Sequence, residues 1–156
     1  RTIGTAHHVL GQISLARGDA PSLTTAIDHL RKAVVALPRT SKPSAHGETQ
    51  LLLGIALASQ AASEGPATLS EAVEAYRAAV ATIDEGTHPM SFASAHNNLA
   101  AALVQQAGTS DASLLREAIQ SYYKALGVFT KTTFPPQHAI IQRSLEQSQA
   151  KLEAMT

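Results

Sequence analysis

Histidines give this chain its widest range of chemistry, because an imidazole can ligate a metal or transfer a proton near neutral pH. His7 and His8 are adjacent, so on a helix their rings would point to different faces. His88 and His96 are about two helical turns apart, but His88 precedes Pro89, where we expect a helix to begin. The chain contains no His-x3-His pair with a helical carboxylate, the pattern of a helical zinc site. We therefore predict no metal site and no cofactor.

The other reactive residue types form no catalytic pattern either. The chain has no cysteine, which excludes thiol nucleophiles, disulfides and Cys-based zinc sites. Gly4, Gly11 and Gly18 are evenly spaced along the chain, so they fall on helix and turn positions, not in one phosphate-binding loop. Glu71 and Glu74 lie near an expected helix end and are interpreted as surface charges, not as a paired acid and base. We predict that the chain is not an enzyme.

The charge balance argues against nucleic acid and membranes as partners. Lys and Arg together number 12, as do Asp and Glu, so no net field attracts polyanions or anionic lipid. Arg31-Lys32 is a lone basic dipeptide. The apolar run from Leu51 to Ala58 is far shorter than the roughly 20 residues of a membrane span. With no cysteine and no visible secretory signal, we expect a reducing, cytoplasmic location.

An internal repeat organises the chain. Six series of residues recur at an interval of 46 positions, and Leu10 precedes Leu53 by 43 because the first turn is shorter. The series are Leu53, Leu99 and Leu145; Leu23, Leu69 and Leu115; Ala26, Ala72 and Ala118; Leu30, Tyr76 and Tyr122; Ala33, Ala79 and Ala125; and Pro43, Pro89 and Pro135. We therefore predict three repeats over 1–43, 44–89 and 90–135, and a last helix over 136–156, in a single domain.

Each repeat is predicted to contain two helices, so the fold class is all-α. In the second helices, an Ala, a large residue and an Ala fall at i, i+4 and i+7, which places them on one helix face. We expect first helices over 4–16, 47–61, 90–106 and 137–153, and second helices over 23–37, 69–83 and 114–130.

Residues that favour helix ends flank these segments. Thr68 with Glu71 matches a capping box, and Ser22 is the corresponding candidate cap for the preceding second helix. Gly18, Gly65 and Gly108 fall between paired helices, where positive φ is common.

The spacing and residue types resemble the tetratricopeptide repeat family. First helices carry Leu10-Gly11, Leu53-Gly54 and Leu99-Ala100, second helices carry the Ala/large/Ala set, and Pro38 closes the first unit. Two features depart from the family. The interval of 46 exceeds the usual period of about 34, and the family's Trp position holds His7, Gln50, His96 and Gln142. The longer repeat looks like those of large bacterial multidomain proteins. The resemblance implies a right-handed α-solenoid of antiparallel helix hairpins, whose concave side holds a peptide or partner protein.

The resemblance also indicates which residues would face that concave groove. These are His8, Gln12, Glu48, Leu51, Ile55, Asn97, Asn98, Ala101, Arg143 and Gln147. Leu51 and Ile55 would offer an apolar anchor site, or would instead pack against neighbouring helices. The Asn97 and Asn98 amides could pair with a peptide backbone. The first three first-helices contain no Lys, which argues against a carboxylate clamp of the kind that some family members use.

The two ends of the array differ. Glu146 and Gln149 replace smaller or apolar residues of earlier units, so the last helix is predicted to be a polar cap. No such cap covers Ile3, Val9 and Ile13, and we expect further repeats upstream or a homodimer partner there. Since the chain opens without Met, it is expected to be a segment of a longer protein. The leading function is a protein-interaction scaffold; the alternative is a structural array that self-associates or spaces other domains.

Overall fold

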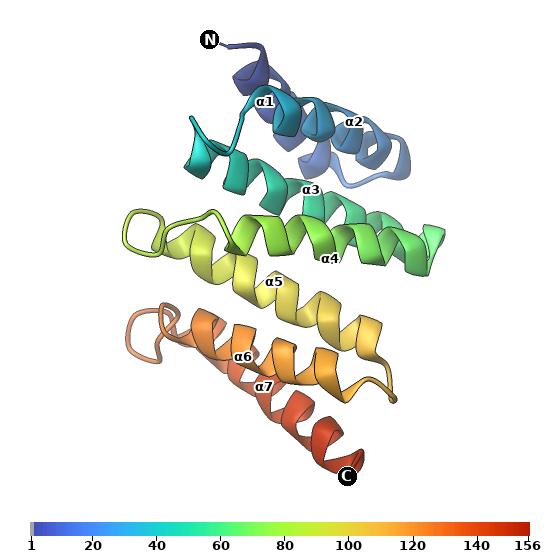
Figure 1. The fold of residues 1–156 in the computed structure, drawn as a ribbon, viewed down its shortest axis with the longest axis vertical. Coiled ribbons are helices and arrows are strands. Elements are labelled where there is room, and N and C mark those ends of the chain that lie inside the picture. The colour runs from blue at the N-terminus through green and yellow to red at the C-terminus, as the bar shows by residue number, and fades with distance from the viewer. Residues whose placement is uncertain (1) are drawn as a thin grey trace. The chain divides into compact units, whose positions relative to one another are not determined.

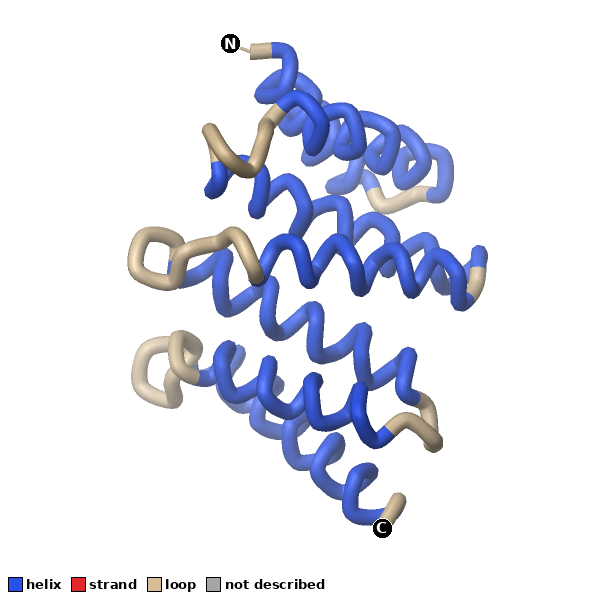
Figure 2. The backbone as a smooth tube through the Cα atoms, viewed as in Figure 1, coloured by secondary structure: helices blue, strands red, loops and turns tan. Residues whose placement is uncertain are grey.

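The computed structural model describes residues 2–156, and the fold is all-α (Figure 1). Figure 2 shows helices joined by loops, and the described residues contain no strand. The helices are α1 (Ile3–Arg17), α2 (Ala20–Ala36), α3 (Pro43–Glu64), α4 (Pro66–Val80), α5 (Pro89–Ala107), α6 (Ala112–Leu126) and α7 (Pro135–Ala154). None of the described helices is long and apolar enough to cross a membrane.

The chain divides into two compact units, the first ending at Asp84 and the second beginning at Glu85. In the first unit, α1 packs on α2, α2 on α3 and α3 on α4. An ideal Cβ on Gly4 would lie 2.8 Å from Cγ of Leu37, and one on Gly11 would lie 2.6 Å from Cγ of Leu30. Because the glycines and leucines come in reverse order, α1 and α2 run in opposite directions and approach closely through glycine.

The predicted Ala/large/Ala faces form the core of each unit. Ala26, Leu30 and Ala33 of α2 are fully buried. In the second unit, α5 packs on α6 and α6 on α7, and α7 also contacts α5. Ala118 and Ala125 there are fully buried and Tyr122 nearly so. Small residues on either side of one large residue therefore allow close helix packing in both units.

The helix ends agree with the sequence in part. Pro43, Pro89 and Pro135 each begin a helix, as expected for a residue without an N–H, and the three inter-helix glycines have positive φ. Two predicted caps are wrong. Asp19, not Ser22, caps α2, since its carboxylate accepts the Ser22 N–H. Helix α4 begins at Pro66, so Thr68 lies inside the first turn and cannot form the predicted capping box.

Two histidines join consecutive helices in a way that the sequence analysis missed. His46 Nδ1 donates to the Leu37 carbonyl at 2.8 Å, and His138 Nδ1 donates to the Phe129 carbonyl at 3.1 Å. Each bond ties the first turn of a helix to the end of the preceding one, within one unit. The signal was available, because His46 and His138 are separated by two repeat intervals.

Candidate functional site

The predicted groove residues of the first unit lie on α1 and α3. His8 and Gln12 are in α1, and Glu48, Leu51 and Ile55 are in α3. Gln12 is exposed, while His8, Glu48 and Ile55 are half-buried. Leu51 is only 8% exposed, so its side chain packs within the protein and we leave it out of the proposed site.

His8 has a structural partner. Its Nδ1 lies 2.8 Å from the Thr49 hydroxyl, and that hydroxyl donates its own proton to the Ala45 carbonyl at 2.7 Å. The Thr49 oxygen can therefore only accept from His8, which fixes the proton on Nδ1. Burial lowers the pKa of His8, and the nearby Glu48 charge opposes that effect. His8 is therefore a neutral donor that links α1 to α3, and its Nδ1 is occupied by the Thr49 contact.

The predicted residues of the second unit lie on α5 and α7, where the structure contains a pocket. Asn97, Asn98 and Ala101 are in α5, and Arg143 and Gln147 are in α7. Ala101, Arg143 and Gln147 are exposed, and the two asparagines are half-buried. Of the ten predicted residues, Asn97 lines the pocket between these helices.

This pocket, which we call the α5/α7 pocket, has a volume of ≈ 310 Å³. Its lining residues are Met90, Ser94, Asn97, Phe129, Gln137, Ile140 and Ile141. The α5 members are spaced i, i+4 and i+7 and therefore share one face of that helix. The walls carry accessible apolar surface, because Met90 is 46% and Ile140 is 64% exposed.

The floor of the α5/α7 pocket is held in place by local contacts. Phe129 is buried and meets Phe134 edge to face, with ring centroids 5.2 Å apart. The Phe129 carbonyl accepts the His138 hydrogen bond from the first turn of α7. Pro135 fixes the start of the same helix. A floor with these restraints can present a preformed apolar surface to a ligand.

Polar groups at the α5/α7 pocket are amides and a hydroxyl. Asn97 makes no side-chain hydrogen bond to another described residue, so its amide can offer one donor and one acceptor to a bound backbone. No charged side chain lines the pocket. Arg143 follows Ile140 by one helical turn and is exposed, so its guanidinium lies on the adjoining helix surface.

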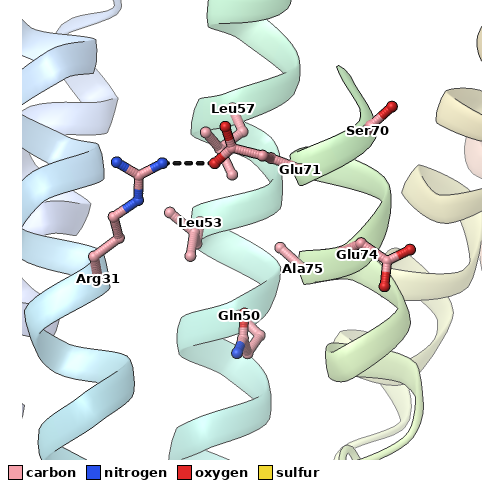
Figure 3. A pocket seen from close by; sticks show the side chains of 8 residues that line it. All are labelled: Arg31, Gln50, Leu53, Leu57, Ser70, Glu71, Glu74 and Ala75. Carbon is pink, nitrogen blue, oxygen red and sulfur yellow. Dashed lines mark hydrogen bonds and ion pairs between the residues drawn. The ribbon is translucent and has the colours of Figure 1, made fainter. Parts of the chain in front are cut away.

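A second pocket, in the first unit, is crossed by an ion pair (Figure 3). Its volume is ≈ 430 Å³, and its apolar floor includes Leu53 and Leu57 of α3. Arg31 reaches from α2 to Glu71 of α4, with 2.7 Å between Nη2 and Oε2. Both side chains are more than half exposed, so the pair contributes about 0–1 kcal/mol. The pair links α2 to α4 across the lining of this pocket.

The Arg31–Glu71 pair was not predicted from the sequence, in which Arg31-Lys32 is a lone basic dipeptide. An Arg and a Glu with the same separation recur one repeat later as Arg77 and Glu117, but Arg77 forms an ion pair with Glu74 of its own helix, at 2.8 Å.

The described residues offer no arrangement for metal chemistry. Residues 2–156 contain no group of three or more His, Asp or Glu side chains placed to hold a metal ion. Comparisons of the chain with protein-family models, with curated proteins and with solved structures found no match. Accessible apolar and polar groups converge at the α5/α7 pocket.

Proposed function

We propose that the chain is a binding scaffold that holds an extended peptide segment of a partner protein, and that it performs no catalysis. The observation that carries the proposal is the α5/α7 pocket, in which exposed Met90 and Ile140 flank the amide of Asn97. An apolar pocket with a few convergent polar groups is the usual form of a recognition site. The peptide would insert one aliphatic or aromatic side chain and pair its backbone with Asn97.

We infer that the architecture is a tetratricopeptide-like, right-handed α-solenoid of antiparallel helix hairpins. Support comes from the repeated packing of a first-helix glycine against the large residue of the following helix, as in Gly11 with Leu30 and Gly54 with Tyr76. The reversed order of these contacts along α1 and α2 also supports a hairpin. In such an array, first helices such as α5 and α7 line the concave side that the resemblance assigns to peptides.

The pocket also favours a particular peptide chemistry. Its lining is uncharged, so a charged anchor would lose hydration without gaining an ion pair. Arg143, one turn beyond Ile140, could pair with a carboxylate next to the anchor. The preferred segment is therefore an apolar residue followed closely by Asp or Glu, in an extended conformation.

Short synthetic peptides can test this preference. We would add capped heptapeptides, Gly/Ser except for a central Leu, Phe or Lys followed by Glu or Gln, to ¹⁵N- and ¹³C-methyl-labelled protein. The expected result is that the Leu-Glu and Phe-Glu peptides shift the Asn97 side-chain amide and Ile140 methyl resonances, while the Lys peptides do not. Ile140→Ser and Asn97→Ala should each weaken binding at least fivefold.

Gln105→Ala is the matched control, because it removes an exposed amide from the same helix as Asn97 but lies outside the pocket. Its binding should equal that of the wild type. Resonance shifts confined to other helices, or equal binding by the Leu and Lys peptides, would show that this pocket is not the recognition site.

A further inference from the structure

The outer face of α1 and α2 carries unusual apolar exposure for a folded chain. Ile3, Leu10 and Ile13 of α1 are 75%, 45% and 53% exposed, and Val35 of α2 is 82% exposed. Ile3 and Val35 also line a hollow of ≈ 370 Å³ on this face. Clustered exposed aliphatic residues of this kind mark interaction surfaces. We call this surface the α1/α2 face.

Equivalent positions in the next repeat indicate what kind of partner the α1/α2 face binds. Ala6, Leu10 and Ile13 share one side of α1 and are exposed. Their counterparts 43 positions later in α3 are Thr49, Leu53 and Ala56, and all three are buried. The same positions are therefore open in the first repeat and covered in the second.

The cover over these α3 positions is the preceding pair of helices. Thr49 accepts the hydrogen bond from His8 of α1, and Leu53 lies in the pocket that Arg31 of α2 closes against Glu71. The α1/α2 face is thus the equivalent of a surface that, one repeat later, is occupied by packed helices. Its own occupant should be helical as well.

The α1/α2 face lacks the charged partner that α4 offers to α2. Arg31 of α2 forms an ion pair with Glu71 of α4. The position equivalent to Glu71, one interval of 46 earlier, is Thr25, which cannot accept an ion pair from an arginine. The face instead carries Asp28 and Lys32, paired with each other at 2.9 Å and both exposed. The charges of Asp28 and Lys32 on the α1/α2 face therefore neutralise each other.

We propose that the α1/α2 face binds the α1/α2 face of a second copy of this chain, forming a two-fold homodimer. A two-fold axis places the same patch of the two protomers face to face, so apolar residues contact apolar residues. Lys32 of each protomer can then pair with Asp28 of the other. A head-to-tail arrangement is disfavoured. From Arg143 to the end of α7 the exposed side chains are mainly polar or charged, including Arg143, Glu146, Gln147, Lys151 and Glu153. This proposal is independent of the α5/α7 pocket.

Sedimentation equilibrium from 1 to 200 µM at pH 7.5 tests the dimer. The wild type should show a reversible monomer–dimer equilibrium, and Leu10→Glu with Ile13→Glu should weaken it at least tenfold. Both side chains are substantially exposed, so the double variant should keep the circular dichroism spectrum of the wild type. Gln12→Glu is the control, because it adds charge to an exposed α1 position next to Ile13 without removing apolar surface. A wild type that stays monomeric at 200 µM would overturn the proposal.

A charge-swapped pair tests whether the occupant is a second copy in this orientation. Asp28→Lys gives two positive charges at positions 28 and 32, and Lys32→Asp gives two negative charges. Each variant alone should dimerise at least fivefold more weakly than the wild type, because like charges meet across the axis. An equimolar mixture should recover the association as a heterodimer. If the mixture associates no better than its components, the faces do not meet in this way and the proposal fails.

Discussion

The Tyr76 ring lies directly against the backbone of Gly54, since an ideal Cβ on Gly54 would lie 2.5 Å from Cδ1 of the ring. Tyr76 is 3% exposed, and burial raises its pKa far above the ordinary value. The phenol is therefore held neutral in the core. Contact between a glycine in α3 and a ring in α4 sets how closely these helices approach.

Gly54→Ala should destabilise the protein. Overpacking of a core costs about 1–3 kcal/mol, and the better helix propensity of Ala returns about 1 kcal/mol. We expect a net loss of about 1 kcal/mol in the free energy of unfolding, measured by urea denaturation. Gly127→Ala is the control, because Gly127 has a helical φ of −64° and its nearest neighbour is a carbonyl of its own turn. Equal stability of the two variants would mean that the Tyr76 contact does not limit helix approach.

Any side chain at position 65 should destabilise the protein, because of the backbone conformation of Gly65. Its φ of 95° and ψ of −164° fall in a region that is essentially restricted to glycine, and it both ends α3 and precedes α4. We expect Gly65→Ala and Gly65→Asn each to lose about 1–3 kcal/mol of unfolding free energy. Gly18→Asn should be much milder, because φ 74° and ψ −7° are left-handed values that Asn adopts. Thermal unfolding of the three variants checks this order, and similar losses at both positions would contradict it.

Structural features that arise from packing repeated in each unit could be predicted from the sequence, whereas the exact ends of helices could not. The helices and their buried Ala/large/Ala faces were predictable because the same packing recurs at one interval. The predicted ends of the second helices, at 37, 83 and 130, lie beyond the observed ends at Ala36, Val80 and Leu126. Ile83 and Phe129 remain buried after α4 and α6 have ended, so the apolar pattern continues where the helix does not.

The candidate site was predictable only in part, for a different reason. Asn97 could be identified from its position relative to Leu99, but Met90 and Ile140 join it only when α5 and α7 fold together. Leu51 is apolar, as expected of a residue that anchors a ligand in a groove, yet it is buried. A single sequence does not distinguish an aliphatic residue that packs against a neighbouring helix from one that lines a pocket.

Asp19 should make folding stability depend on pH in the acidic range. Its carboxylate accepts hydrogen bonds from the Ser22 N–H and hydroxyl, both at 2.9 Å, and these bonds lower the pKa of Asp19. A carboxyl whose pKa is lower in the folded protein stabilises it above the unfolded pKa, and the effect disappears as pH falls through the folded pKa. The difference in unfolding free energy between wild type and Asp19→Asn should therefore be larger at pH 7 than at pH 2. A difference that is constant over this range would contradict the prediction.

His96 should produce a second pH dependence at higher pH. Burial, and to a smaller extent the Lys124 charge, lower its pKa to about 4, and its buried Nδ1 has no hydrogen-bond partner. Because the unfolded histidine titrates near 6.5, the unfolded state binds more protons between these values, and stability falls as pH drops from about 6.5 toward 4. His96→Gln, which installs the residue found at the equivalent positions 50 and 142, should flatten that slope in urea unfolding.

Titration of the His96 ring protons by NMR gives a direct measure of the same effect. The midpoint should lie near 4, and Lys124→Ala should raise it because one repelling charge is removed. Lys131→Ala is the matched control, since Lys131 is an exposed lysine outside the helices and is not among the groups that shift His96. A midpoint near 6.5 in the wild type would show that the ring is solvated in the folded protein. In that case His96 could not account for loss of stability in mild acid.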